Sequence, residues 1–175
     1  MFEDKGSERK ICIICSKGTL DMAYPGLVLA NAALMEGAQV TMFFTFWGLE
    51  MVHREKMHHL KVSPLGNPAM PMKMPFGPEG FQNIAWPMPN LLMANAPGFE
   101  SLATTLMKQT FKNKGVATVE ELRDMAVEMD VRLIGCQMTM DVFGFKKEEF
   151  IPQAEIGGAA MFLEYAADAD VQLFI

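Results

Sequence analysis

Short apolar runs alternate with longer stretches of helical periodicity along this chain. The runs lie at residues 10–15, 40–46, 131–136 and 171–175. Continuous apolar runs of this length are typical of strands that are buried on both faces of a parallel sheet. Enough chain separates successive runs for a helical crossover. The pattern therefore predicts an α/β fold, with a mostly parallel central sheet covered by helices on both faces.

The helical stretch after the first run is expected to begin or kink near Pro25 and to stop at Gly37. Proline breaks the interior of a helix, and glycine favours the position just beyond its end. A short polar helix is then expected over residues 49–60.

Besides a short helical segment after residue 136, three further helices are expected in the second half of the chain. One lies around 99–112, and another begins after Thr118, where a capping-box pattern marks a helix start. The last is expected from about Pro152 and contains Gly157 and Gly158.

Residues 61–97 interrupt this alternation. Eight of the ten prolines lie in this segment, which predicts a long insertion with little regular structure inside a single domain of residues 1–175. The insertion is also rich in methionine, at Met70, Met72, Met74, Met88 and Met93.

The composition favours self-association and argues against nucleic acid as a partner. Half of the residues are hydrophobic and the mean hydropathy is +0.13, so apolar surface is expected to be covered in a homo-oligomer, with residues 61–97 at the contacts between subunits. The net charge is −6, whereas phosphate binding needs a basic patch.

Localisation is expected to be cytoplasmic. Residues 1–10 contain no apolar segment of the secretory type, and no apolar run approaches the ~18 residues of a membrane span. Three cysteines leave one unpaired in a monomer, which fits a reducing compartment.

Cys136 is the sharpest candidate for chemistry. It ends a predicted strand, and residues 137–142 can start a helix, whose first amides stabilise a thiolate. A thiolate attacks sulfane sulfur and then holds it as a persulfide. Asp141 would oppose this by raising the thiol pKa. An inert, buried cysteine is the alternative.

Cys12 and Cys15 form a CxxC pattern inside a strand. Redox pairs of this type lie at helix starts, whereas an odd separation along a strand sends two side chains to opposite faces. Cys12 is expected in the core. Cys15, at the strand tip beside Lys17, is a candidate second thiol facing Cys136.

A non-enzymatic binding module is the competing hypothesis. The loop 16–19 weakly suggests a phosphate cradle for FMN, and Met70, Met72 and Met74 could bind a soft metal. The histidines at 53, 58 and 59 indicate a solvated helical face rather than a metal site. Dinucleotide, P-loop and GxSxG signatures are absent from the sequence, so no cofactor is expected under the leading hypothesis.

Three segments carry a resemblance to a known family: GLVLANAALMEGAQVTMFFTFWGLE, VRLIGCQMTMDVFGF and GGAAMFLEYAADADVQLFI. The chain resembles the DsrE/DsrF/DsrH-like proteins over nearly its whole length, and the DsrE2-type subgroup most of all.

The resemblance implies a three-layer flavodoxin-like fold that assembles into trimers or hexamers and takes part in cytoplasmic sulfur trafficking. The sulfur-carrying cysteine of the family corresponds to Cys136. The implied function is a sulfur carrier or sulfurtransferase, with sulfur donor and acceptor proteins as partners.

Overall fold

The computed structural model describes residues 9–63, 78, 80 and 95–175. Its contacts divide the chain into two units, one of Met1–Leu60 with Val119–Ile175 and the other of Lys61–Thr118. Each unit is described by itself. Most of the predicted insertion at 61–97, with all five of its methionines, lies outside the described residues.

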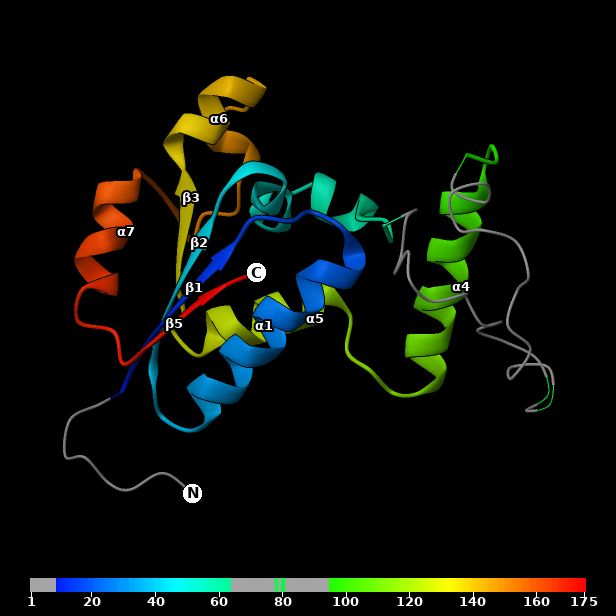
Figure 1. The fold of residues 1–175 in the computed structure, drawn as a ribbon, viewed down its shortest axis with the longest axis horizontal. Coiled ribbons are helices and arrows are strands. Elements are labelled where there is room, and N and C mark those ends of the chain that lie inside the picture. The colour runs from blue at the N-terminus through cyan, green and yellow to red at the C-terminus, as the bar shows by residue number, and fades with distance from the viewer. Residues whose placement is uncertain (1–8, 64–77, 79, 81–94) are drawn as a thin grey trace. The chain divides into compact units, whose positions relative to one another are not determined.

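The first unit is built on a five-stranded parallel sheet with the order β4-β3-β2-β1-β5 (Figure 1). The predicted α/β class and parallel sheet are confirmed. The strands are β1 (Lys10–Cys15), β2 (Gln39–Phe44), β3 (Arg132–Cys136), β4 (Ala154–Gly157) and β5 (Val171–Phe174).

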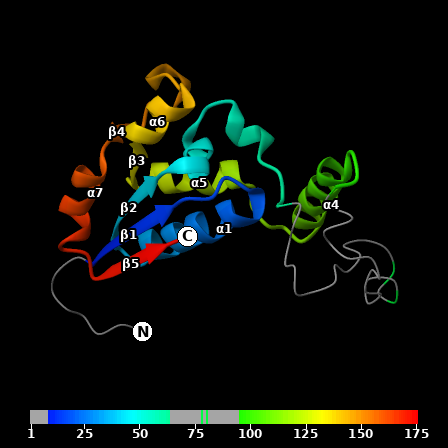
Figure 2. The same cartoon turned by 45° about the horizontal axis from the view of Figure 1, so that its top comes forward.

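Helices form a layer on each face of this sheet (Figure 2). α1 (Leu20–Met35) and α5 (Val119–Glu128) pack together on one face, and α7 (Ala159–Ala166) covers the other. α6 (Gln137–Phe143) follows the end of β3 directly. Among the described residues, no helix is both long and apolar enough to cross a membrane.

Strand alternation sorts the core side chains between the two layers. On the α7 side, the ring of Phe43 stacks on Phe162 at 5.0 Å between centroids, and Cys12 belongs to the same buried cluster. The intervening positions, such as Met42 and Leu133, are fully buried on the α1 side.

α1 ends where the sequence predicts and begins earlier. Gly37, with φ +80°, donates its N–H to the Leu34 carbonyl at 2.9 Å, and Ala38 donates to Ala33 at 3.0 Å. This pair of bonds is the Schellman arrangement. Pro25 lies inside the helix, in its second turn, so α1 tolerates the loss of one backbone hydrogen bond there instead of beginning at the proline.

Two expectations about secondary structure are wrong. Residues 154–157 form strand β4 beside β3 instead of helix, and α7 begins only at Ala159. Pairing at the edge of the sheet decides here, since Ala154–Gly157 align with the β3 residues from Leu133 to Cys136. Gly157 also leaves room for the Met161 sulfur, which would lie 2.4 Å from an added methyl group.

Residues 49–60 do not form a polar helix either. They hold parts of two 3₁₀ helices, η1 (Phe46–Val52) and η2 (Lys56–His59). Several of their side chains are buried in the core, namely Leu49, Met51, Val52 and Met57.

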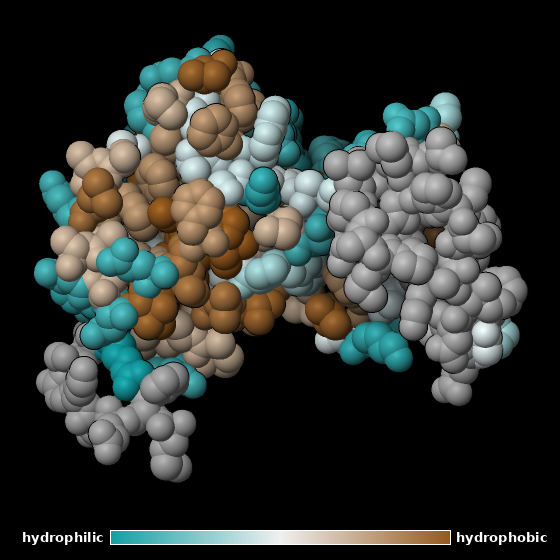
Figure 3. Space-filling model, in the orientation of Figure 1, coloured by the Kyte–Doolittle hydropathy of each residue, from teal (hydrophilic) through white to brown (hydrophobic). Residues whose placement is uncertain are grey.

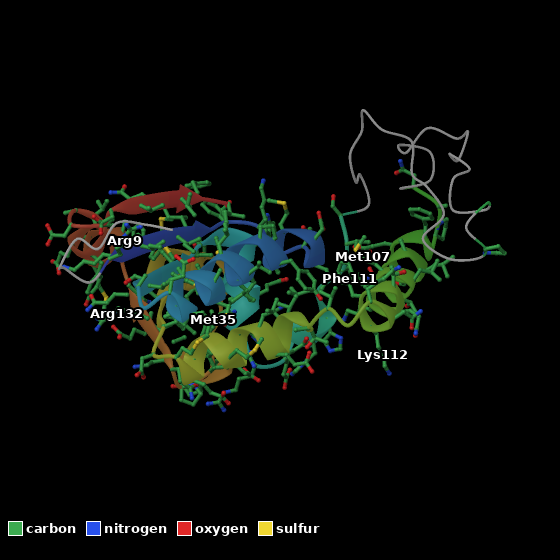
Figure 4. All side chains as sticks on the ribbon, turned by 90° about the horizontal axis from the view of Figure 1, so that it is seen from below. Arg9, Met35, Met107, Phe111, Lys112 and Arg132 are labelled. Carbon is green, nitrogen blue, oxygen red and sulfur yellow. The ribbon has the colours of Figure 1, made fainter. Side chains whose placement is uncertain are left out.

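In the second unit, helix α4 (Phe99–Asn113) confirms the helix expected around 99–112. The Thr104 hydroxyl accepts the Val62 N–H at 3.1 Å, which ties the start of the unit to the helix. Met107 and Phe111, four residues apart, lie on one side of α4, and Lys112 points away from them (Figure 4).

Candidate functional site

Cys136 is both the last residue of β3 and the N-cap of α6. No loop separates the strand from the helix, so the backbone amides of the first turn of α6 lie close to the Cys136 sulfur. The side chain is buried, with 5% of its surface exposed. The sequence expectation of a strand-end cysteine at a helix start is confirmed.

Burial is the largest single influence on the Cys136 thiol, and it raises the pKa. Hydrogen bonds to the sulfur oppose it: the hydroxyl and the amide of Thr139 donate, followed by the Thr45 hydroxyl and the Met138 amide. Their combined effect leaves the pKa of Cys136 below its ordinary value. The Asp141 carboxylate, which the sequence suggested as an opposing charge, accepts a hydrogen bond from the Gln137 side chain at 2.8 Å.

The two hydroxyls at the sulfur come from different elements and contact each other. Thr45 follows the last residue of β2, and Thr139 lies in the first turn of α6; their Oγ1 atoms are 3.2 Å apart. The Phe46 amide donates to Thr139 Oγ1 at 3.1 Å, and Phe46 itself has a left-handed backbone with φ 47°. Such strain is held in place by surrounding contacts.

Sequence reasoning missed Thr45 and Thr139. Each stands within three residues of a strand end, in the TMFFT and CQMT segments. That position is a signal, but only the pairing of β2 with β3 brings the two hydroxyls together.

Two glycines hold the loop after β2 against the loop after β1. A methyl group on Gly18 would lie 2.3 Å from the Trp47 carbonyl oxygen, and one on Gly48 would lie 2.1 Å from the Cys15 carbonyl oxygen. The Thr45 amide donates to that Cys15 carbonyl at 3.1 Å. The close crossing of the two backbones therefore fixes the position of Thr45.

Apolar side chains surround this edge of the sheet. The Trp47 ring stacks on Phe143 of α6 at 4.9 Å between centroids. Four large apolar side chains in the segments that follow β2 and β3 have more than half of their surface exposed: Phe46 at 52%, Trp47 at 59%, Met138 at 58% and Val142 at 72%. A buried sulfur with an apolar, exposed rim suits exchange with a partner that covers the site.

The structure does not bring Cys15 to Cys136. Cys15 is 1% exposed, and its sulfur lies against Gly26 of α1, on the face opposite Cys136. Burial raises the pKa of Cys15 to about 12. Cys12 lies in the core on the α7 side, as expected, and burial raises its pKa as well. All three cysteines are free thiols.

The histidines do not share one solvated face. His53 is buried between the rings of Phe145 and Phe150, and its Nδ1 accepts the amides of Glu55 and Lys56 at 3.2 Å. Burial is the main cause that lowers the pKa of His53. Within the described residues, no group of three or more His, Cys, Asp or Glu side chains could hold a metal ion.

The loop 16–19 fits a phosphate poorly. The amide and hydroxyl of Ser16 both donate to the Ile175 carbonyl, at 2.7 and 3.0 Å, and the Trp47 carbonyl fills the space beside Gly18. The Thr19 hydroxyl is buried and makes no hydrogen bond to the described residues. With Ser16 bonded to Ile175 and the space beside Gly18 filled, the arrangement gives little support to FMN binding.

A hollow of about 320 Å³ lies at the opposite end of the sheet from Cys136. It opens beside the first residues of β1 and β2 and the end of α7. Its lining mixes both signs of charge, through Lys10, Glu164 and Asp168, and its one thiol, Cys12, has its pKa raised by burial.

A parallel α/β sheet with a hydrogen-bonded cysteine at the carboxyl end of a central strand is thus the class that fold and site define. Comparison with known proteins makes it specific. The family model of the DsrE/DsrF/DrsH-like family matches residues 7–174, so the chain belongs to that family. The family predicted from the sequence is confirmed.

Individual relatives agree with this membership. The sulfur carrier protein DsrE2 of Allochromatium vinosum is 44% identical over 168 residues, which cover 96% of this chain and 99% of the relative. The protein YrkE of Bacillus subtilis is 27% identical over 95% of this chain and 97% of its own length. The crystal structure of the ychN protein from E. coli shares the fold, with a TM-score of 0.56 at 12% identity over 95% of this chain and 99% of that one.

Proposed function

We propose that this protein is a sulfur carrier that holds sulfane sulfur as a persulfide on Cys136 and passes it to an acceptor thiol. The observation that carries the proposal is the position of Cys136 at the start of α6, where the first turn of the helix and Thr45 donate hydrogen bonds to its buried sulfur and keep its pKa below the ordinary value. The similarity to the A. vinosum sulfur carrier supports the same function.

The transfer balances without an external oxidant or reductant. The Cys136 thiolate attacks the terminal sulfur of a donor persulfide, a new S–S bond forms, and the donor's S–S bond breaks. The donor leaves as a thiolate, and Cys136 becomes the persulfide. An acceptor thiolate then takes the terminal sulfur in the same way and restores the Cys136 thiolate. The partners are therefore thiol-bearing sulfur donors and acceptors.

Intact mass spectrometry after exposure to polysulfide tests the proposal. We expect the wild-type protein to gain the mass of one or more sulfur atoms, and Cys136→Ser to gain none. Cys12→Ser and Cys15→Ser are the matched controls. Both should load normally, because their sulfurs lie in the core and are protonated at neutral pH.

Loading of Cys136→Ser at the wild-type level would refute the assignment. Loss of loading in Cys15→Ser, with its fold intact, would move the nucleophile to β1 and revive the two-thiol mechanism.

We also propose that the carrier works in the cytoplasm as a homo-oligomer, with trimers or hexamers expected from the family. Apolar side chains gather over β5 and α1 (Figure 3). Phe174 is 73% exposed on the edge strand, and Val28 and Leu29 are about half exposed on the helix. Such a patch is typical of a surface that another subunit covers.

Sedimentation measures the oligomeric state of the protein and of its variants. We expect the intact protein to be oligomeric, and Phe174→Lys with Val28→Lys to shift it toward monomer. A variant with residues 66–90 replaced by a short Gly/Ser linker tests the insertion separately. A monomeric wild type contradicts the oligomer, and an unchanged oligomer in the linker variant removes the insertion from the contacts.

A further inference from the structure

A pair of threonine hydroxyls stands at the Cys136 sulfur, and the sulfur transfer by itself assigns them no role. Thr139 is 2% exposed, so its hydroxyl cannot turn to bulk water. The Oγ1 atoms of Thr139 and Thr45 lie 3.2 Å apart, and either can be the donor. One lone pair of Thr139 Oγ1 is already occupied by the Phe46 amide at 3.1 Å.

The number of hydrogens limits what the pair can donate. Each hydroxyl supplies one hydrogen, and the bond between the two hydroxyls uses only one of them. Whichever threonine donates to the other, one hydrogen is left to point elsewhere. The Cys136 sulfur is the neighbour to which both side chains bond.

The charge on the sulfur decides how many hydrogens turn toward it. A bond from a hydroxyl to an anion is about twice as strong as one between neutral groups. When the sulfur is an anion, both hydrogens gain by pointing to it, and the bond between the hydroxyls is given up. When the sulfur is neutral, the hydroxyls gain more from each other.

We propose that Thr45 and Thr139 form a hydroxyl clamp that stabilises the anionic sulfur on Cys136, first as the thiolate and then as the persulfide anion. The persulfide part of this inference rests on the proposed function, whereas the thiolate part does not. The clamp joins β2 to α6 at the sulfur, so the reactive edge is assembled from two segments far apart in the sequence.

The thiolate part is tested on unloaded, full-length protein by the alkylation rate of Cys136 against pH, with the cysteine identified by peptide mass mapping. The variants are Thr45→Val, Thr139→Val and the double variant, because valine keeps the branched shape and removes the hydroxyl. In the double variant, we expect the fraction of Cys136 that is thiolate at neutral pH to fall about tenfold or more. Each single variant should show a smaller decrease.

Three variants separate this role from a merely structural one. Thr139→Ser and Thr45→Ser keep the hydroxyl and should show the wild-type midpoint in the plot of alkylation rate against pH. Thr41→Val makes the same change within β2, on the sheet face that carries Cys136, and should leave the midpoint unchanged. If the double variant fails to fold, the single Val and Ser variants still decide.

The persulfide part is read from the half-life of the loaded persulfide in the same variants, with a shorter life expected without the hydroxyls. A wild-type midpoint in the folded Val variants, or Ser variants that behave like Val, overturns the clamp while sulfur loading stands. A wild type that takes up no sulfur refutes the carrier function, and the shift in the alkylation midpoint still reports on the thiolate clamp.

Discussion

Cys15 and Cys136 occupy similar places in the sheet, yet their thiols differ. Each is the last residue of a parallel strand, and each is buried, at 1% and 5% exposure. The pKa of Cys15 is raised to about 12, whereas that of Cys136 lies below its ordinary value. The carboxyl end of a strand therefore does not by itself define a reactive thiol.

The segment after each strand explains the difference. After β1, a loop leads away and α1 begins only at Leu20, so the Cys15 sulfur meets Gly26, and no donor among the described residues offsets its burial. After β3, helix α6 begins at once, and its first amides and a hydroxyl reach the sulfur. Hydrogen-bond donors at the sulfur outweigh burial at one site, and burial acts alone at the other.

The largest expected contrast is in alkylation by iodoacetamide at pH 8. A thiol with a pKa of about 12 is ionised to about one part in ten thousand there, whereas the pKa of Cys136 lies below its ordinary value, so a much larger fraction of Cys136 is ionised. The lower nucleophilicity of the more acidic thiolate offsets part of this difference. We expect Cys136 to react at least about tenfold faster than Cys15.

Peptide mapping of the native protein measures both rates in one sample, and the unfolded protein is the control. In denaturant the two rates should converge within a few-fold. Comparable alkylation rates of Cys136 and Cys15 in the folded state would contradict the predicted difference between the two thiols.

The pH dependence of stability gives an intermediate effect. Cys15 keeps its proton in the folded state up to about pH 12, whereas in the unfolded chain it ionises near about pH 8.5. The stabilisation is thus fully present below about pH 8.5 and is lost as the pH rises toward 12. Between these values, the wild type should lose about 1.4 kcal/mol per pH unit more than Cys15→Ala.

Denaturant unfolding at several pH values between 8 and 11 gives this difference, in which the contributions of lysine and tyrosine cancel. Parallel curves for wild type and Cys15→Ala would mean that Cys15 ionises as readily in the folded as in the unfolded protein.

The smallest effect concerns packing behind Cys15. A methyl group on Gly26 would lie 2.7 Å from the Cys15 sulfur. Overpacking costs about 1–3 kcal/mol, and alanine returns up to about 1 kcal/mol in helix propensity. Gly26→Ala should therefore destabilise the wild type by about 1 kcal/mol and stabilise the Cys15→Ala background, where the sulfur is gone.

Thermal or chemical unfolding of the four proteins of this double-mutant cycle measures the coupling, and sulfur loading on Cys136 should be the same in all four. Gly158→Ala is a matched control, because nothing lies within 4 Å of its added methyl group. A Gly26→Ala penalty of equal size in both backgrounds would show that the sulfur is not what the methyl group meets.

Local patterns predicted most of the sheet and the position of Cys136. Four strands, the end of α1 at Gly37 and the opposite faces of Cys12 and Cys15 follow from apolar runs, one glycine and strand parity. Strand β4 was missed because the residues Ala154–Gly157 carry no apolar run of their own and become a strand only by pairing with β3.

The surroundings of the sulfur could not be predicted in the same way. Thr45 and Thr139 are 94 residues apart, and their contact depends on strand order. The interior position of His53 depends on Phe145 and Phe150, which come from a distant loop. The periodicity of the sequence predicts on which face of a strand or helix a side chain lies. It does not predict which hydrogen-bond donors from other elements reach that side chain, because tertiary structure determines them.

The crossing of the two loops at Gly18 and Gly48 limits how this edge can be redesigned. Each glycine leaves room for a carbonyl oxygen of the other loop, so neither loop can accept even a methyl group unless the other one moves. Transplanting the reactive cysteine with its helix onto another scaffold would therefore leave behind the part that holds Thr45. A working graft needs the segments 15–18 and 45–48 together with 136–139, transferred as one unit.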